Sequence, residues 1–112
     1  MEVSSLATAA PFTTKDGSTI RELHHTDAQS LAEATLAAGQ STQRHFHRAS
    51  EEIYFVLEGE GELEIDGDRR RIAPGDAALI PAGAWHELVA ASAMRFLCSC
   101  APAYSHEDTF FE

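Results

Sequence analysis

The sequence predicts an all-β protein, either a sandwich or a closed barrel of short strands. Turn-forming residues, mainly Gly, Pro and the Asp66-Gly67 pair, recur roughly every eight to twelve residues along most of the chain. The runs between them are short, rich in apolar and β-branched side chains, and lack the period of an amphipathic helix. Many short strands at even spacing are typical of sandwiches and barrels.

The expected strands lie between these turn signals. They are the runs 19–23, 31–36, 43–48, 52–57, 62–66, 69–73, 77–80, 85–89 and 94–99. Residues 31–38 are rich in alanine and could form a helix on propensity alone, but Gly39 and the next strand follow at once, which favours a strand. We expect residues 1–16 to form a loose N-terminal arm, residues 17–103 the barrel, and residues 104–112 an acidic C-terminal tail that either packs on the body or stays mobile.

The chain has 112 residues and a formal net charge of −10 at pH 7, with 18 Asp and Glu against 8 Lys and Arg. This length fits one domain with a core of its own. The acidic balance argues against nucleic acid as a partner, because binding a phosphate backbone requires clustered basic residues. No run is apolar enough to span a bilayer, and the first residues do not resemble a signal peptide. We therefore expect no membrane partner and a cytoplasmic protein.

Cys98 and Cys100 are the only cysteines. Residues two apart on a strand share a face, but their Cα atoms lie roughly 6.5 to 7 Å apart, at or beyond the upper limit for a disulfide. Two reduced thiols are expected, in agreement with a cytosolic location. Both would share a strand face with Phe96 and could look into a barrel, as small buried apolar groups rather than as ligands.

The run Ile53 to Leu57 is apolar at every position. Alternation places Tyr54 and Val56 on one face and Phe55 on the other, so both faces require burial. A small barrel covers its inner face by itself, whereas the outer face needs the N-terminal arm or a second copy of the chain. We expect a homodimer that buries Phe55; the alternative is a sandwich sheet covered within the monomer.

Three histidines and a carboxylate indicate a metal site. His45 and His47 project from one face of a strand, one pleat apart, so both imidazoles can reach one ion at about 2.1 Å per bond. A carboxylate follows at Glu51 or Glu52, after a turn that would lay the next strand beside the first. The Pro and Gly turn at residues 81–83 delivers His86 at the start of a strand. Such a set leaves coordination positions open for water or a small molecule.

The same residues stand at the spacing of two known motifs. The first runs, with gaps of five, one, four and six residues, through Gly39, His45, His47, Glu52 and Gly59. The second runs, with gaps of five, one and two residues, through Gly75, Pro81, Gly83 and His86. In this order they resemble the two motifs of the cupin superfamily, in particular its small single-domain members of the RmlC-like kind. Only the last position of the second motif, often Asn, departs from the pattern, as Ala90.

The resemblance implies a double-stranded β-helix, the jelly-roll barrel of cupins, with a site inside it. Carried over by position, the metal ligands fall on His45, His47, Glu52 and His86. Glu51 competes for the carboxylate role, but the six-residue gap to Gly59 favours Glu52, with Tyr54 lining the same interior. Imidazole and carboxylate suit one divalent ion of Fe, Mn, Ni, Co or Zn. One carboxylate against such an ion leaves the site positive, which favours an anionic or chelating ligand.

Other side chains are weaker candidates. Tyr54 could hydrogen-bond a substrate, although a buried tyrosine is more often part of a core. One of four arginines could anchor an anion in the pocket, and the sequence does not choose among Arg21, Arg44, Arg48 and Arg95. Four glutamates alternate with other residues along one run, and they are expected to form a solvated strand edge: Glu58, Glu60, Glu62 and Glu64.

The resemblance is compatible with three roles. The first is a metal-dependent enzyme, either a dioxygenase or an isomerase or lyase, that acts on a small polar or anionic metabolite. The second is a non-catalytic module that binds a sugar or another metabolite, and a purely structural barrel is a third. The same barrel hosts all of these, so the resemblance does not fix a substrate.

Overall fold

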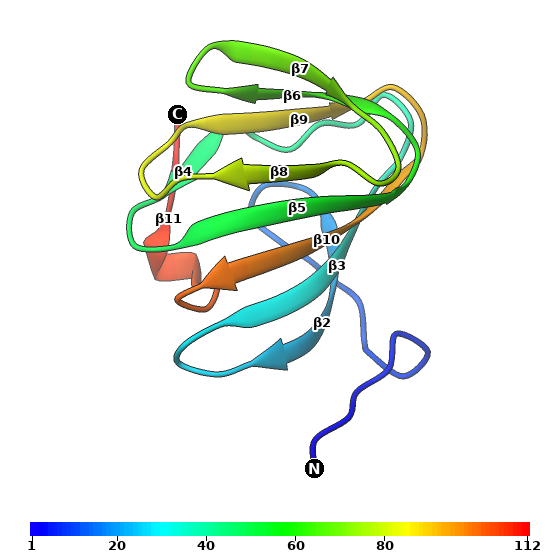
Figure 1. Cartoon of the computed structure of the whole chain (residues 1–112), viewed down its shortest axis with the longest axis vertical. Coiled ribbons are helices and arrows are strands. Elements are labelled where there is room, and N and C mark those ends of the chain that lie inside the picture. Colours follow the sequence, from blue (N-terminus) through cyan, green and yellow to red (C-terminus); the bar gives the residue numbers. More distant parts are fainter.

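A computed structural model describes all 112 residues. Two antiparallel sheets face each other across the interior (Figure 1). The first sheet has six strands in the order β1-β2-β3-β10-β5-β8, and the second has five in the order β11-β4-β9-β6-β7. The elements are β1 (Phe12–Thr13), β2 (Thr19–His25), β3 (Ser30–Leu36), β4 (His45–His47), β5 (Glu51–Glu58), β6 (Gly61–Ile65), β7 (Asp68–Ile72), β8 (Ala77–Ile80), β9 (His86–Ala90), β10 (Met94–Ala101), the 3-10 turn η1 (His106–Asp108) and β11 (Thr109–Phe111). No helix that could span a bilayer is present.

The all-β jelly roll expected from the sequence is confirmed. Each expected strand overlaps one of the strands β2 to β10, and the alanine-rich segment forms β3, not a helix. Two further strands, β1 and β11, were not expected. Both are very short and depend on their neighbours, because Phe12 pairs with Ile20 of β2 and Phe110 pairs with Phe46 of β4.

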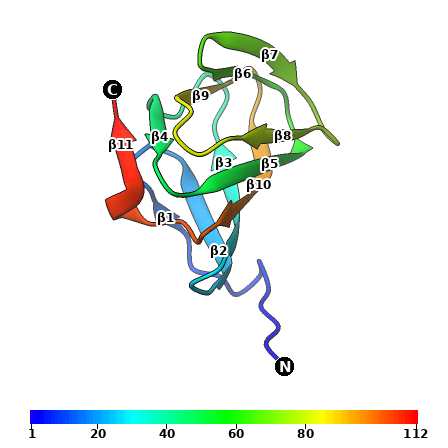
Figure 2. The ribbon, with the colours of Figure 1, turned by 60° about the vertical axis from the view of Figure 1, so that its left-hand side comes forward.

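The ends of the chain are partly built into the sheets. Figure 2 shows β11 alongside β4, and the first residues extending away from the body. The acidic tail therefore packs on the body at its last strand. The arm attaches to β2 at two places, through β1 and through Ser4, whose hydroxyl donates to the carbonyl of Leu23 at 2.7 Å.

The two faces of β5 differ in burial, because side chains alternate along a strand. Glu52, Tyr54 and Val56 are buried, and the residues between them are exposed. Tyr54 and Val56 join the apolar core, where Phe96 of β10 is among the most buried side chains. The motif thus places one carboxylate on the inward face of a strand that is otherwise apolar there.

The outward face of β5 is apolar and is not covered within the chain. Ile53 is 42% exposed, Phe55 39% and Leu79 56%, and Ile53 stands opposite Leu79 in the pairing of β5 with β8. The N-terminal arm lies against β2 and does not cover these residues. No other part of the chain therefore covers this apolar face.

The expected solvated edge of glutamates is wrong at Glu64. Strand β6 is not an edge, because β9 and β7 pair with its two sides. Glu64 is buried, and its carboxylate accepts hydrogen bonds from Arg44 Nε at 2.6 Å and from the amide of Gly67 at 2.7 Å. The charged and backbone donors compensate the carboxylate for the water that it loses.

Gly59 shows why a motif glycine is needed. It ends β5 with φ +78°, which favours glycine, and a Cβ at this position would collide with the backbone carbonyl of Ala93. The turn from β5 to β6 therefore passes against the segment before β10 more closely than any other residue would allow.

Candidate metal centre

Three of the four expected ligands come from one sheet. His45 and His47 are alternate residues of β4 and both are buried. His86 is the first residue of β9 and pairs directly with His45 across the two strands, with ring centroids 4.2 Å apart. Direct cross-strand partners share a face of the sheet, so all three imidazoles point into the barrel.

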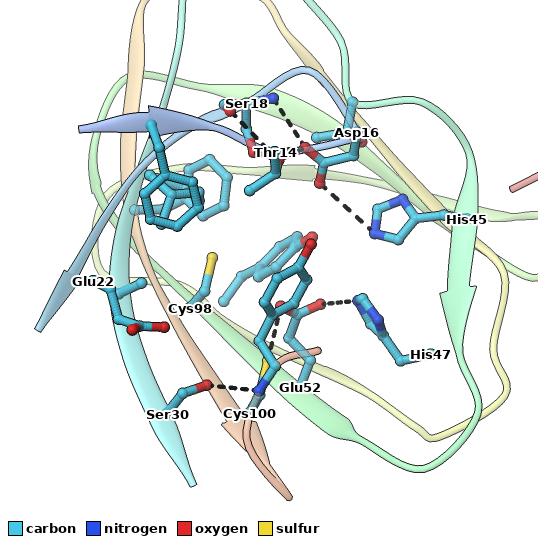
Figure 3. A pocket seen from close by; sticks show the side chains of 18 residues that line it. Thr14, Asp16, Ser18, Glu22, Ser30, His45, His47, Glu52, Cys98 and Cys100 are labelled. Atoms are coloured by element: carbon cyan, nitrogen blue, oxygen red, sulfur yellow. Dashed lines mark hydrogen bonds and ion pairs between the residues drawn. The ribbon is translucent and has the colours of Figure 1, made fainter. Parts of the chain in front are cut away.

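The carboxylate comes from the facing sheet. Glu52 lies on the inward face of β5, is buried, and approaches two of the histidines through Oε1, which is 3.5 Å from His47 Nε2 and 3.4 Å from His86 Nε2. Glu51 lies on the exposed face of the same strand. The structure therefore brings Glu52, not Glu51, to the histidines (Figure 3).

The separations suit one ion. Ligand atoms of the three histidines all lie within 4.8 Å of one another. Two donors that each lie about 2.1 Å from a metal are roughly 3.0 to 3.4 Å apart when adjacent in octahedral or tetrahedral geometry. The distance from Glu52 Oε1 to His86 Nε2, 3.4 Å, lies at the upper end of this range, and the distance to His47 Nε2, 3.5 Å, lies just above it.

Hydrogen bonds fix the tautomers of His45 and His86. Nδ1 of His45 lies 2.6 Å from the carbonyl oxygen of Gln43, and Nδ1 of His86 lies 3.0 Å from that of Ala84. A carbonyl oxygen only accepts, so each Nδ1 carries the proton and donates. In the neutral rings Nε2 then holds the lone pair, as in histidine ligands whose second nitrogen is held by an outer partner.

The tautomer of His47 is fixed by a hydrogen bond to a hydroxyl group. Its Nδ1 is 3.2 Å from Thr109 Oγ1, and that hydroxyl donates its only proton to the carbonyl of Ser105 at 2.9 Å. Thr109 can therefore only accept from the ring, which puts the proton of neutral His47 on Nδ1. All three Nε2 atoms present lone pairs to the same interior point.

Two buried atoms at this point have no hydrogen-bond partner, and they are Glu52 Oε1 and His86 Nε2. Both are acceptors, and they face each other at 3.4 Å. A buried polar atom without a partner costs about 1 to 3 kcal/mol, and two facing acceptors add repulsion. A cation between them would satisfy both, so the residues present fit a metal ion.

The pKa shifts of Glu52 and His45 keep these two donors in a form that can bind a cation. Burial alone would raise the pKa of Glu52, but the imidazoles of His47 and His86 beside it outweigh burial and hold the pKa well below its usual range. Burial, aided by repulsion from His86, lowers the pKa of His45 to about 4. Burial also opposes protonation of His47, yet the Glu52 carboxylate leaves its pKa raised. At neutral pH, Glu52 is therefore ionised and His45 neutral.

A cavity that opens to solvent lies beside His45, His47 and Glu52. Tyr54, Cys98 and Cys100 line it, and the Cys100 thiol lies 3.3 Å from Glu52 Oε2. Both cysteines are free. Burial is the largest of the causes that raise the pKa of each thiol. They therefore line the cavity as neutral, unreactive groups.

The comparison with known families decides what the barrel is. The family described as cupin domain matches residues 32–100, which is well over half of the chain. The chain is a cupin. Both motifs and all four candidate ligands lie within the matched residues, in agreement with the resemblance seen in the sequence.

Among relatives of this cupin, an uncharacterized protein of Methanocaldococcus jannaschii, MJ1618, is 42% identical over 106 residues, which are 88% of this chain and 85% of that protein. An oxalate-binding protein of Thermotoga maritima is 32% identical over 68 residues, 61% of this chain and 56% of that protein. A 5-aminosalicylate 1,2-dioxygenase of Comamonas sp. is 45% identical over only 42 residues, 37% of this chain and 11% of the dioxygenase.

Solved structures share the fold across nearly the whole cupin. KdgF from Halomonas sp. superposes with a TM-score of 0.85 at 21% identity, covering 96% of this chain and 97% of that one. The nucleoside dehydratase Pac13 from Streptomyces superposes with a TM-score of 0.86 at 16% identity, covering 100% of this chain and 91% of that one. At these identities the likeness concerns the fold alone.

None of the four candidate arginines lines the cavity of this cupin. Arg21 and Arg95 approach Glu33 on the sheet, Arg44 pairs with Glu64, and Arg48 lies over the ring of Phe110. The acidic side chains that line the cavity are Asp16, Glu22 and Glu52. Apart from a bound metal, the cavity therefore offers an anion no permanent positive charge.

Tyr54 lies inside the barrel, as its alternation with Glu52 predicts. It is buried against Phe96, with ring centroids 4.9 Å apart, and its ring centroid is 6.2 Å from that of His86. Tyr54 therefore packs in the core, as expected, and it also forms part of the cavity wall.

Sequence reasoning missed Asp16. This residue was assigned to the loose arm, whereas the structure places its carboxylate on the cavity wall, with Oδ2 3.8 Å from His45 Nε2. The pair Asp16-Gly17 is a turn signal that could have indicated an ordered bend there. Nothing in the sequence indicates that this bend lies opposite β4.

Proposed function

We propose that this cupin is a metal-dependent enzyme acting on a small polar molecule, with one divalent ion held by His45, His47, Glu52 and His86. The observation that carries the proposal is a cluster of three buried imidazoles, two of which approach within 3.5 Å a buried carboxylate oxygen that has no hydrogen-bond partner. Fe, Mn, Ni, Co and Zn all accept such donors. When bound, the ion would act as a Lewis acid toward an oxygen of the substrate.

Backbone and side-chain groups of the protein orient the ligands and shape the cavity around them. The backbone carbonyls of Gln43 and Ala84 hold two of the rings in their binding orientation. The apolar wall, which includes Phe96 and Tyr54, limits the water around the ion and strengthens the electrostatic interactions of a bound molecule. Tyr54 is one of the wall residues that would contact that molecule.

The second candidate is a binding module without turnover. The similarity to an oxalate-binding protein favours it, whereas the partial similarity to a dioxygenase favours the enzyme. The cavity has an acidic side chain at more than one place on its wall and no arginine or lysine, which makes a dianionic ligand a poor fit for this chain. We therefore place the enzyme first.

Metal analysis tests the site. The protein purified without added metal, and again after incubation with each candidate ion, is expected to hold about one ion per chain. His86→Ala and Glu52→Ala are expected to lose it, whereas His24→Ala, which removes an exposed histidine outside the cavity, keeps it. Equal metal content in all three variants would contradict the assignment.

A second measurement separates the two functions. The metal-loaded protein is incubated with uncharged sugars, amino alcohols and diols while oxygen uptake and product formation are followed, and binding is measured in parallel by calorimetry. Turnover that disappears in His86→Ala supports the enzyme. Tight binding without turnover across the panel supports the module.

We further propose a cytoplasmic homodimer. The two free cysteines suit a reducing compartment. The uncovered apolar face of β5 and β8 suits a second copy of the same face, since a two-fold dimer buries one patch against itself.

A further inference from the structure

The bend before β2 holds the Asp16 carboxylate in one orientation. Oδ1 accepts three hydrogen bonds, from Thr14 Oγ1 at 2.5 Å, from the backbone amide of Ser18 at 2.9 Å and from Ser18 Oγ at 2.7 Å. Thr14 and Ser18 are themselves buried. With Oδ1 saturated, Oδ2 is the oxygen left for other partners, and it faces the cavity and His45 (Figure 3).

Oδ2 and His45 Nε2 face each other at 3.8 Å. The proton of His45 lies on Nδ1, where it is donated to Gln43, so Nε2 presents a lone pair. Two acceptors at this distance do not bond to each other, and a cation or a hydrogen-bond donor beside them would satisfy both. A metal ion on Nε2 leaves Oδ2 next to any molecule bound to that ion on the His45 side.

The charges of the cavity point the same way. A divalent ion is neutralised by the two carboxylates of Glu52 and Asp16, whereas the charge of Glu22, which is 38% exposed, is screened by solvent. An anion entering the cavity would meet no net attraction. A neutral or cationic molecule that carries hydroxyl or amino hydrogens would instead find Oδ2 ready to accept one of them.

We propose that Asp16 selects the ligand of this site, by accepting a hydrogen bond from a hydroxyl or amino group of a metal-bound molecule and by repelling carboxylates, phosphates and other anions. The substrate class is then an uncharged or cationic hydroxy or amino compound. The proposal rests on the metal centre proposed above, and it assigns a role in ligand choice to the segment that precedes β2.

The test uses the full chain loaded with Co(II), whose visible absorption reports ligand binding. Two probes are titrated at pH 8.5: 2-aminoethanol, which chelates with O–H and N–H groups on its binding atoms, and azide, an anion without hydrogen. Asp16→Asn keeps the shape but removes the charge. It is expected to weaken 2-aminoethanol about tenfold and to tighten azide about tenfold, since hydrogen bonds to charged groups are worth that much or more.

Glu22→Gln is the matched control. It removes one negative charge from the same cavity wall, but its carboxylate lies beside His25 Nδ1 at 3.1 Å and is 38% exposed. Both affinities are expected to change less than about threefold, because solvent screens this exposed charge. Equal effects of the two variants would show a general charge effect and overturn the role of Asp16.

The remaining outcomes separate this inference from the metal centre itself. If the wild-type chain holds Co(II) but Asp16→Asn changes neither affinity, the inference fails and the metal centre stands. If the wild-type chain takes up no Co(II), both fail. If Asp16→Asn does not fold, a crystal structure of the wild-type protein with Co(II) and 2-aminoethanol decides. Oδ2 within about 3 Å of a ligand oxygen or nitrogen supports the inference, and any other position, including direct coordination to the metal, overturns it.

Discussion

The stability of the metal-free protein is expected to fall between pH 7 and pH 5 because of His45. This ring is 2% exposed, and burial together with repulsion from His86 lowers its pKa to about 4, against 6.5 in the unfolded chain. Between these two values the unfolded chain binds a proton that the folded chain does not. Unfolding is therefore favoured increasingly as the pH falls through this window.

The magnitude follows from the two pKa values. For a single group that shifts from 6.5 to about 4, the free energy of unfolding drops by about 2 kcal/mol between pH 7 and pH 5. His47 acts in the opposite direction. Its raised pKa contributes stability that is present at low pH and lost as the pH rises through the folded pKa. The contribution of Glu52, whose pKa is lowered, is lost only below the usual range of a glutamate and lies outside this window.

Because these contributions overlap, the prediction concerns a difference between proteins. Urea unfolding at pH 7, 6 and 5, with a chelator present, is compared for wild type and His45→Gln. The variant is expected to start less stable, since the Gln43 carbonyl loses its donor, but to lose about 2 kcal/mol less than wild type over the interval. His24→Gln, at an exposed position, should retain the wild-type pH dependence. Parallel curves for wild type and His45→Gln would refute the assignment of a neutral, buried His45.

Three further predictions follow from other parts of the structure. Phe55→Asp should convert a dimer to a monomer in light scattering, whereas Val89→Asp, at the similarly exposed position on the other sheet, should not; a wild-type monomer would contradict the proposed interface. Gly59→Ala should lower the free energy of unfolding by roughly 3 kcal/mol, because the backbone conformation and a carbonyl collision both oppose a Cβ, while Gly67→Ala, with open space and φ +88°, should cost about 1 kcal/mol; equal losses in urea unfolding would contradict the collision. Thr109→Val should weaken metal binding about tenfold in competition with a chelator, because the ring that donates to it loses its acceptor; unchanged affinity would mean that the tail does not orient this ligand.

Much of the barrel could be predicted because its signals are local. Turn residues mark the ends of a strand, and the alternation of apolar residues within it shows which side chains are buried. Both signals come from residues close together in the sequence. The motif spacing places Glu52 on the inward face, and the structure agrees in burying it while Glu51 is exposed. The strand β3 also followed from its surroundings, since a glycine and another strand leave no room for a helix there.

The features that could not be predicted depend on distant partners. Strands β1 and β11 are too short to be recognised alone and exist because Phe12 meets Ile20 and Phe110 meets Phe46. Glu64 is buried only because Arg44, twenty residues earlier, reaches its carboxylate. Such pairings are set by the closed barrel and leave no periodic trace in the sequence.

The residues of the site come from two kinds of segment, the motifs and the two ends of the chain. The motif residues supply the metal donors, whose spacing is fixed by the strands that carry them. The residues that orient or complement those donors come partly from the two ends of the chain, Thr109 from the tail and Asp16 from the segment before β2. A chain with both cupin motifs intact but with different ends would keep the donors while changing how His47 is held and what faces His45. Changes at the two ends of the chain would therefore alter the surroundings of the candidate ligands without any change in the motifs.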